Sequence, residues 1–202
     1  MGRKSISIDH AVYEEFALQA SKQNKTLFSF ANEALSLISQ TSAEGATPDK
    51  LKSTWRITSI LKEMDVITLP GDFVDGLVSK IWEYDKDYLL NAFRNLGNRI
   101  VPLLKTMAED LNDLSDVAKQ FATILPVKEF SLVEKPDESI EVLVVGAGRI
   151  VEATACMAEF IRGVLDGYQY SVMKQEMSLG IIRLTAFRRG AWQSQRTRAI
   201  SP

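Results

Sequence analysis

The chain has only one cysteine and one histidine in 202 residues, and the scarcity of these two residue types limits its chemistry. A single thiol, Cys156, cannot form a disulfide within the chain, which suits a reducing compartment. Because His10 is the only imidazole, one chain cannot assemble a zinc site from the usual ligands, and we expect no metal and no cofactor. No apolar run approaches the length of a membrane span, and the N-terminus lacks the apolar region of a signal peptide. We therefore expect a cytoplasmic protein without membrane partners.

Sequence patterns typical of catalysis are also scarce. Serines are plentiful, but none lies in Gly-x-Ser-x-Gly. The segment Val-Gly-Ala-Gly-Arg at 145–149 follows an expected strand and precedes an expected helix, yet the third glycine of a dinucleotide site would fall at Val151. The Lys-Ser/Thr pair of a phosphate loop is missing too, so we interpret the segment as a glycine turn entering a helix. An enzyme is the least favoured class, and we assign no catalytic residue.

The formal net charge of −2 is not typical of a protein dominated by nucleic-acid contacts. The charge is unevenly distributed, because residues 1–62 contain eight Lys or Arg against six acidic residues, whereas the remainder contains 16 against 20. At 202 residues, the chain is long enough for one large or two modest domains.

The first forty residues contain a short alternating segment followed by two helical patterns. In Ser-Ile-Ser-Ile at 5–8, the period of two predicts a strand with Ile6 and Ile8 on one face and Ser5 and Ser7 on the other. A lone strand cannot satisfy its backbone, and the nearest partner is the same strand of a second copy. The pair would form an antiparallel ribbon with a polar, basic outer face, which would fit the DNA major groove.

Capping residues predict where the two helices begin and end. Asp9 is a good N-cap for a helix from His10, and Asn24 is a plausible left-handed C-cap. Thr26 can cap the second helix, which carries Phe30 among its apolar residues.

This stretch resembles the ribbon-helix-helix family of dimeric DNA-binding proteins, without a gap from Ile-Ser-Ile at 6–8 to Phe-Ala-Asn-Glu-Ala-Leu at 30–35. The resemblance implies a homodimer bound to double-stranded DNA. It implies that the DNA contacts come from Arg3, Lys4, Ser5, Ser7, Lys25, Thr26, Leu27 and Phe28. It implies that the dimer core contains Ile6, Ile8, Phe16, Phe30 and Ala34.

Two departures from the family pattern affect the expected DNA contacts. Ser5 and Ser7 stand where the family often carries longer side chains, and serine discriminates bases weakly. Leu27 and Phe28 replace the usual polar pair beside the phosphate. We therefore expect weak or indirect readout, and a ribbon that only holds a dimer together is the alternative.

The remaining chain predicts a helical segment and then a ββαββ domain, an α+β architecture with an antiparallel sheet. Helices are expected near 50–64, 73–82, 85–107 with a kink at Pro102, and 112–125. Hairpins are expected at 128–134 with 139–145 and at 170–176 with 181–187, on either side of a helix over 150–166. The expected domains are the DNA-binding module at 1–40, a linker and connecting helix at 41–64, the α+β domain at 65–190, and a basic, disordered tail at 191–202.

Three stretches of the second domain, near 89–100, 159–167 and 172–187, resemble the vinyl-reductase-type ligand-binding domain. Many members carry two cysteines near the final hairpin, and this chain has none there, which argues against a thiol or metal role at that place. The resemblance implies a pocket for a small apolar ligand, whose candidate residues are Trp82, Tyr88, Phe93, Arg149, Cys156 and Phe160.

Together these features predict a homodimeric transcriptional regulator whose C-terminal domain senses a small ligand or mediates oligomerisation. The alternative is an antitoxin-like or adaptor protein, in which the ribbon only dimerises and the C-terminal domain binds a protein partner. A cavity in the second domain would favour the sensor, whereas a flat apolar patch would favour the adaptor.

Overall fold

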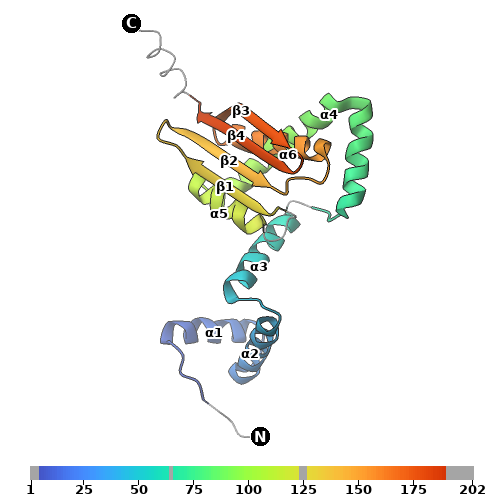
Figure 1. The fold of residues 1–202 in the computed structure, drawn as a ribbon. Helices are drawn as coiled ribbons and strands as arrows, with labels where there is room; N and C mark the ends of the chain where they lie inside the picture. The colour runs from blue at the N-terminus through green and yellow to red at the C-terminus, as the bar shows by residue number, and fades with distance from the viewer. Residues whose placement is uncertain (1–4, 64–65, 123–126, 190–202) are drawn as a thin grey trace. The chain divides into compact units, whose positions relative to one another are not determined.

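The computed structural model describes residues 5–63, 66–122 and 127–189. Within them the chain forms two compact units, with the boundary between Trp55 and Arg56. Unit 1 contains α1 (His10–Lys22), α2 (Leu27–Ala43) and the first part of α3 (Pro48–Glu63). Unit 2 contains the rest of α3 followed by α4 (Gly71–Lys105), α5 (Leu111–Ala122), β1 (Glu129–Glu134), β2 (Ser139–Val145), α6 (Val151–Gly167), β3 (Tyr170–Ser178) and β4 (Ile181–Arg188) (Figure 1).

The predicted N-terminal β-ribbon is wrong. Residues 5–9 are extended but join no sheet, and the first regular element is α1. The alternation of Ile6 and Ile8 with serines is the pattern of a strand, but a strand also needs a neighbour for its backbone groups, and none of the described segments pairs with residues 5–9. The described part of the chain therefore begins with helices, and its sheet lies in the C-terminal unit.

The capping residues of unit 1 behave as their chemistry predicts. The Asp9 carboxylate accepts a hydrogen bond from the Ala11 backbone N–H at 2.9 Å, at the start of α1. Asn24 has a φ of 54°, the left-handed conformation that lets the chain leave α1. Thr26 Oγ1 then accepts a hydrogen bond from the Ser29 backbone N–H at 3.2 Å, which caps α2.

The ββαββ order of unit 2 is confirmed. The four strands form one antiparallel sheet in the order β1-β2-β4-β3. Its centre consists of facing pairs such as Val142 with Leu184 and Val144 with Ile182, whose side chains are at most 3 % exposed. Helices α5 and α6 lie on this apolar face of the sheet, and α4 packs on α6 (Figure 1).

Helix α4 differs from the predicted pair of helices in one respect. The break between them is present at Asp85, whose φ of −154° and ψ of 81° are not helical, but the helix passes Pro102 without another break. Proline removes the backbone donor to the carbonyl four residues earlier and its ring crowds that carbonyl, yet the backbone at Pro102 stays helical. The helix therefore does not restart at Pro102.

The crossing of α4 and α6 depends on two glycines. A Cβ added to Gly97 would lie 2.1 Å from the Phe160 carbonyl oxygen, and one added to Gly163 would lie 2.1 Å from the Arg94 carbonyl oxygen. Each glycine therefore lets the backbone of the other helix approach more closely than any side chain would permit. This crossing fixes the position of α6 over the sheet.

Candidate functional site: an apolar cavity between α5 and α6

An apolar cavity of about 260 Å³ lies within unit 2, between α5 and α6 and above β1 and β2. The spacing of apolar residues on both helices explains why they face the same space. On α5 the lining residues recur at 114, 117, 118 and 121, and on α6 at 157, 160, 161, 164 and 165, each the pattern of one helix face. The whole wall is formed by Leu61, Ile100, Leu104, Leu114, Val117, Ala118, Phe121, Ala122, Val127, Phe130, Leu132, Val142, Val144, Met157, Phe160, Ile161, Val164 and Leu165.

No polar side chain lies on this wall among the described residues. A ligand with a buried hydroxyl, amide or charge would therefore lose its hydrogen bonds to water without replacement, at a cost of roughly 2–7 kcal/mol for an uncharged group. The cavity volume corresponds to about nine water molecules of bulk liquid. The chemistry of the wall thus selects an uncharged, apolar molecule of about ten carbon atoms.

The predicted pocket residues are divided between this cavity and other places. Phe160 lies on the cavity wall. Trp82, Phe93 and Cys156 instead belong to a second, smaller apolar cluster between α4 and α6. Tyr88 is 65 % exposed.

Arg149, also predicted for the pocket, forms an ion pair on the surface of unit 2. Its Nε donates to Asp75 Oδ2 at 2.9 Å, which joins the start of α6 to α4. The pair therefore fixes the start of α6 against the first part of α4.

The cavity residues of α5 were not predicted as a site, although their pattern is visible in the sequence. Leu114, Val117 and Phe121 recur in the sequence at the spacing of one apolar helix face. Such spacing is the same for a face packed against a core and for one that lines a cavity. Only the separation between α5 and α6 distinguishes the two cases.

Cys156 is a buried thiol with no charged partner that would activate it. Burial, followed by the negative charge of Glu152, raises the pKa of Cys156 to about 11. The thiol therefore stays protonated near neutral pH and is a poor nucleophile.

The glycine turn at 145–149 is held by hydrogen bonds within the fold. The backbone N–H groups of Gly146 and Ala147 donate to the Gly180 carbonyl at 2.7 and 3.0 Å. The Gly180 N–H donates to Thr154 Oγ1 at 3.0 Å, and this hydroxyl donates to the Ile150 carbonyl at 2.9 Å. These contacts join the β3–β4 turn to the start of α6, and they agree with a structural role for the glycines.

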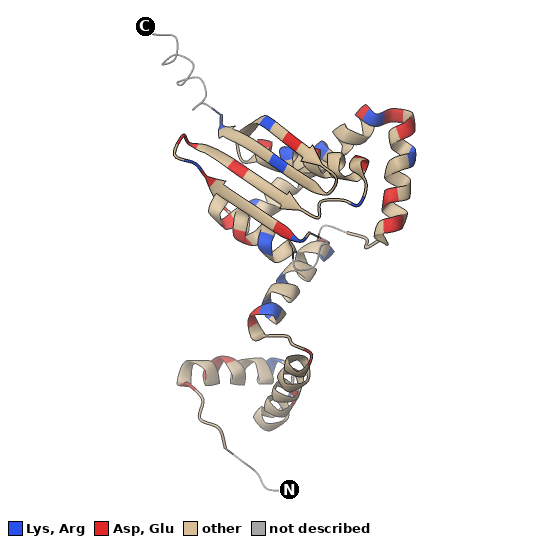
Figure 2. Cartoon of the chain, viewed as in Figure 1, with Lys and Arg blue, Asp and Glu red and all other residues tan. Residues whose placement is uncertain are grey.

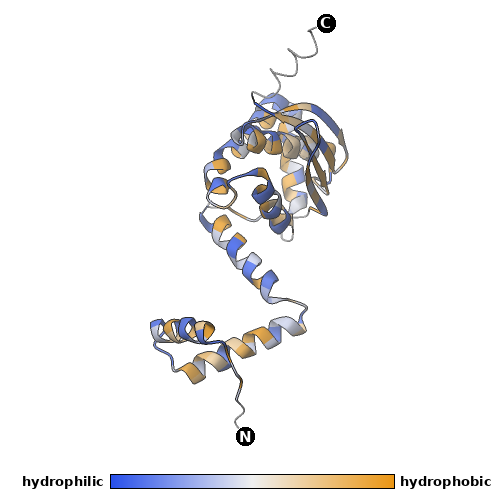
Figure 3. Ribbon diagram, turned by 90° about the vertical axis from the view of Figure 1, so that its left-hand side faces the viewer, coloured by the Kyte–Doolittle hydropathy of each residue, from blue (hydrophilic) through white to orange (hydrophobic). Residues whose placement is uncertain are grey.

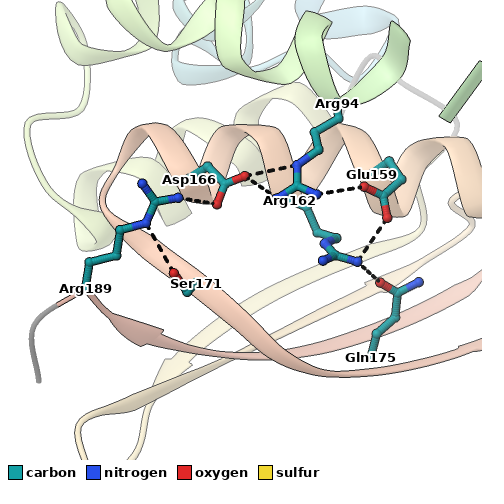
Figure 4. Close-up of polar contacts among 7 residues, drawn as sticks. All are labelled: Arg94, Glu159, Arg162, Asp166, Ser171, Gln175 and Arg189. Atoms are coloured by element: carbon teal, nitrogen blue, oxygen red, sulfur yellow. Dashed lines mark hydrogen bonds and ion pairs between the residues drawn. The ribbon is translucent and has the colours of Figure 1, made fainter. Parts of the chain in front are cut away.

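A network of charged side chains lies on the side of α6 opposite the cavity (Figure 4). Asp166 accepts hydrogen bonds from Arg94 Nη2 and from Arg189 Nη2, each at 2.7 Å. Arg162 Nη1 donates to Glu159 Oε1 at 3.1 Å, and Arg94 Nη1 lies 3.7 Å from Glu159 Oε2. The network joins α4 and the end of β4 to one face of α6, and the opposite face of α6 lines the cavity.

The residues predicted for DNA contact lie in several different environments. Ser5, Ser7 and Phe28 are exposed, and Leu27 is 38 % exposed. Lys25 forms an ion pair with Glu33, and Thr26 caps α2. Arg3 and Lys4 lie outside the described residues, as does the predicted tail at 191–202.

The residues predicted for a dimer core are also in different environments. The rings of Phe16 and Phe30 pack against each other within one chain, with centroids 4.6 Å apart, and join α1 to α2. Ala34 is half-buried, whereas Ile6 and Ile8 are 68 % and 54 % exposed.

Compared with models of known protein families and with curated protein sequences, the chain matches none of them. The two family resemblances therefore stay predictions. Over the described ranges, no helix is long and apolar enough to cross a membrane, and no three His, Cys, Asp or Glu side chains gather in a way that suits a metal ion.

Proposed function

We propose that the protein is a self-associating regulator whose C-terminal unit binds a small, uncharged apolar molecule in the cavity between α5 and α6. The single observation that supports this most strongly is the cavity itself, which has a volume of about 260 Å³ and a wall without polar side chains. The apolar wall also favours an occupant, because a ligand there removes apolar surface from water, at roughly 25 cal/mol per Å².

Self-association is supported by the small core of unit 1. Among its described residues only Ala20 is buried, and α2 has no buried residue at all. Large apolar side chains remain exposed on both helices, and much of α2 is apolar (Figure 3). They include Val12, Leu18, Phe28, Leu35 and Leu37.

Helices of 13 and 17 residues with so little packed surface are marginal in water. A second copy would cover the apolar faces of unit 1 with the same surface, as in most symmetric dimers.

The link between ligand and assembly is proposed to pass through α3. Leu61 of this helix lies on the cavity wall, and Ile57 and Ile60 are buried in unit 2. The same helix continues into unit 1, because the boundary falls between Trp55 and Arg56. A ligand that contacts Leu61 can favour one of two packing arrangements of α3 in unit 2. The free energy of coupling between ligand binding and self-association then equals the difference between the ligand's binding free energies in these two arrangements.

DNA is the first macromolecular partner to test for unit 1. Support comes from the family resemblance and from the Thr26-capped start of α2, where backbone N–H groups could meet a phosphate. The exposed apolar residues of unit 1 equally favour a protein partner, so the adaptor remains the second candidate. A salt series separates them, because DNA binding weakens steeply with added salt, whereas apolar docking does not.

Binding of naphthalene, a fluorescent hydrocarbon of ten carbon atoms, to the full chain tests the ligand proposal. We expect saturable binding of one probe per chain and displacement by decane. Leu132→Trp should abolish it by filling the cavity. Val133→Trp is the matched control, because Val133, next to Leu132 on β1, is 48 % exposed and lies off the cavity wall. If the wild type binds no probe, or if both variants bind like the wild type, the proposal is wrong.

A further inference from the structure

Strand β3 forms one edge of the sheet in unit 2, and its second half is exposed on both faces (Figure 1). Every residue from Met173 to Ser178 is exposed, whereas the first three residues of the strand are half-buried. Among the described residues, no segment pairs with the outer side of β3. Backbone N–H and C=O groups of alternate residues therefore have no partner strand on that side, and such an edge is a template for a further strand.

The chemistry of this edge is symmetric about Gln175. The sequence at 173–177 is Met-Lys-Gln-Glu-Met. The two charged residues of β3 are Lys174 and Glu176, one basic and one acidic (Figure 2). They pair with each other within one chain at 2.6 Å, so the edge has no net charge. When two such strands pair antiparallel about Gln175, Lys174 of each copy lies opposite Glu176 of the other.

We propose that β3 pairs with β3 of a second copy, antiparallel and with the two-fold axis at Gln175, so that the two sheets join into one. A two-fold contact requires that a residue on the axis is compatible with itself. Glutamine meets this requirement, because its amide both donates and accepts and two Gln175 side chains can hydrogen-bond to each other. The exposed Met173 of one copy comes near the exposed Met177 of the other, which removes apolar surface from water.

Charge selects this register over its neighbours. Opposite residues of an antiparallel pair lie on the same face of the sheet, so the next allowed registers place the axis at Lys174 or at Glu176. Two lysines or two glutamates would then lie directly opposite each other, and like charges there are destabilising. The same charges disfavour pairing with an unrelated apolar strand, so they also give the edge its specificity.

The contact is short. The register of β3 against β4 shifts between Val172 and Lys174, and a bulge of this kind increases the local twist, so the regular part of the edge begins after it. Its strength therefore comes from main-chain hydrogen bonds more than from buried area, as in other cases of strand addition. The contact involves only residues of unit 2 and does not depend on the association proposed for unit 1.

Disulfide trapping in the full chain tests the contact. Opposite Cα atoms of an antiparallel pair are about 4.5–5.5 Å apart, within the range that a disulfide spans. With oxidised glutathione as the oxidant, Gln175→Cys should form covalent dimers several-fold faster than Val133→Cys, an exposed position on the other edge strand. The native Cys156 is buried and protonated, so the introduced thiol is the reporter. Equal rates for the two variants would overturn the proposal.

Charge reversal tests the register. In the Gln175→Cys chain, Glu176→Lys places lysine opposite lysine and should slow trapping several-fold. A neighbouring lysine makes a thiol more reactive, so its effect on the thiol itself has the opposite direction. Adding Lys174→Glu makes the opposed charges unlike again and should restore the rate. A rate that Glu176→Lys leaves unchanged, or that the second substitution does not restore, overturns this register.

Sedimentation of Glu176→Lys separates this proposal from the association proposed for unit 1. The variant loses the edge contact but keeps the apolar surface of α1 and α2, so we expect it to dimerise. If it sediments as a monomer at all concentrations, association through unit 1 is wrong, and the trapping rates still decide the edge contact by themselves.

Discussion

Partly filling the cavity should stabilise the ligand-free protein and weaken ligand binding, and Ala118→Leu tests this directly. Ala118 lies on the α5 wall, so a leucine there would project into the cavity. Three added carbon atoms moved out of water contribute about 0.8 kcal/mol each, or roughly 2.4 kcal/mol. Fixing the new side chain costs about 0.5–1 kcal/mol of conformational entropy. The ligand-free variant should therefore unfold with a free energy about 1.5–2 kcal/mol higher than that of the wild type.

Urea denaturation of ligand-free protein measures this change, provided that the slope of the unfolding free energy with urea stays the same. Ala158→Leu is the matched control. Ala158 is 0 % exposed on α6 but lies off the cavity wall, so the same substitution overpacks the core and should destabilise by about 1–3 kcal/mol. If Ala118→Leu destabilises as strongly as Ala158→Leu, the space between α5 and α6 is not a cavity and the functional proposal loses its basis.

Further predictions concern the packing around α6. Gly163→Ala should lower the free energy of unfolding in urea by about 2–4 kcal/mol, because its Cβ would lie 2.1 Å from a carbonyl oxygen. Gly76→Ala, whose Cβ would meet nothing within 4 Å, should raise it by up to about 1 kcal/mol. Equal effects of the two substitutions would contradict the close crossing of α4 and α6. Asp166→Asn should cost about 1–3 kcal/mol because two arginines lose their shared acceptor, while Asp116→Asn, in an exposed pair, should change stability by less than about 0.5 kcal/mol. A loss of less than about 0.5 kcal/mol in the free energy of unfolding of Asp166→Asn would show that the network contributes little to stability. Because its raised pKa keeps the thiol protonated, Cys156 should resist iodoacetamide at pH 8 until the protein is unfolded, and fast labelling of the native protein would contradict this.

Local chemistry made much of unit 2 predictable. The alternation of Ile140, Val142 and Val144 fixes which face of β2 is buried, and the Pro-Asp-Glu turn before it marks the hairpin. The caps at Asp9 and Thr26 were predictable for the same reason, since each depends on residues within one helical turn.

The errors have a common physical cause. Ile6 and Ile8 alternate as in a strand, but pairing depends on a partner that a local pattern does not specify. The predicted pocket shows the same limit. The vinyl-reductase-type resemblance implied a pocket with aromatic residues such as Trp82, yet the cavity is lined by Leu114, Val117 and their neighbours, whose pattern is that of any buried helix face. A void arises from the distance between two elements, which periodicity does not encode.

The most direct test of the account is to look for a bound apolar molecule in the protein itself. Native mass spectrometry of the full chain, before and after addition of decane, should show one uncharged molecule per chain in the wild type and a smaller bound fraction in Ala118→Leu. If each protein shows only the mass of its own bare polypeptide, before and after addition of decane, the central claim that the space between α5 and α6 is a binding site is contradicted.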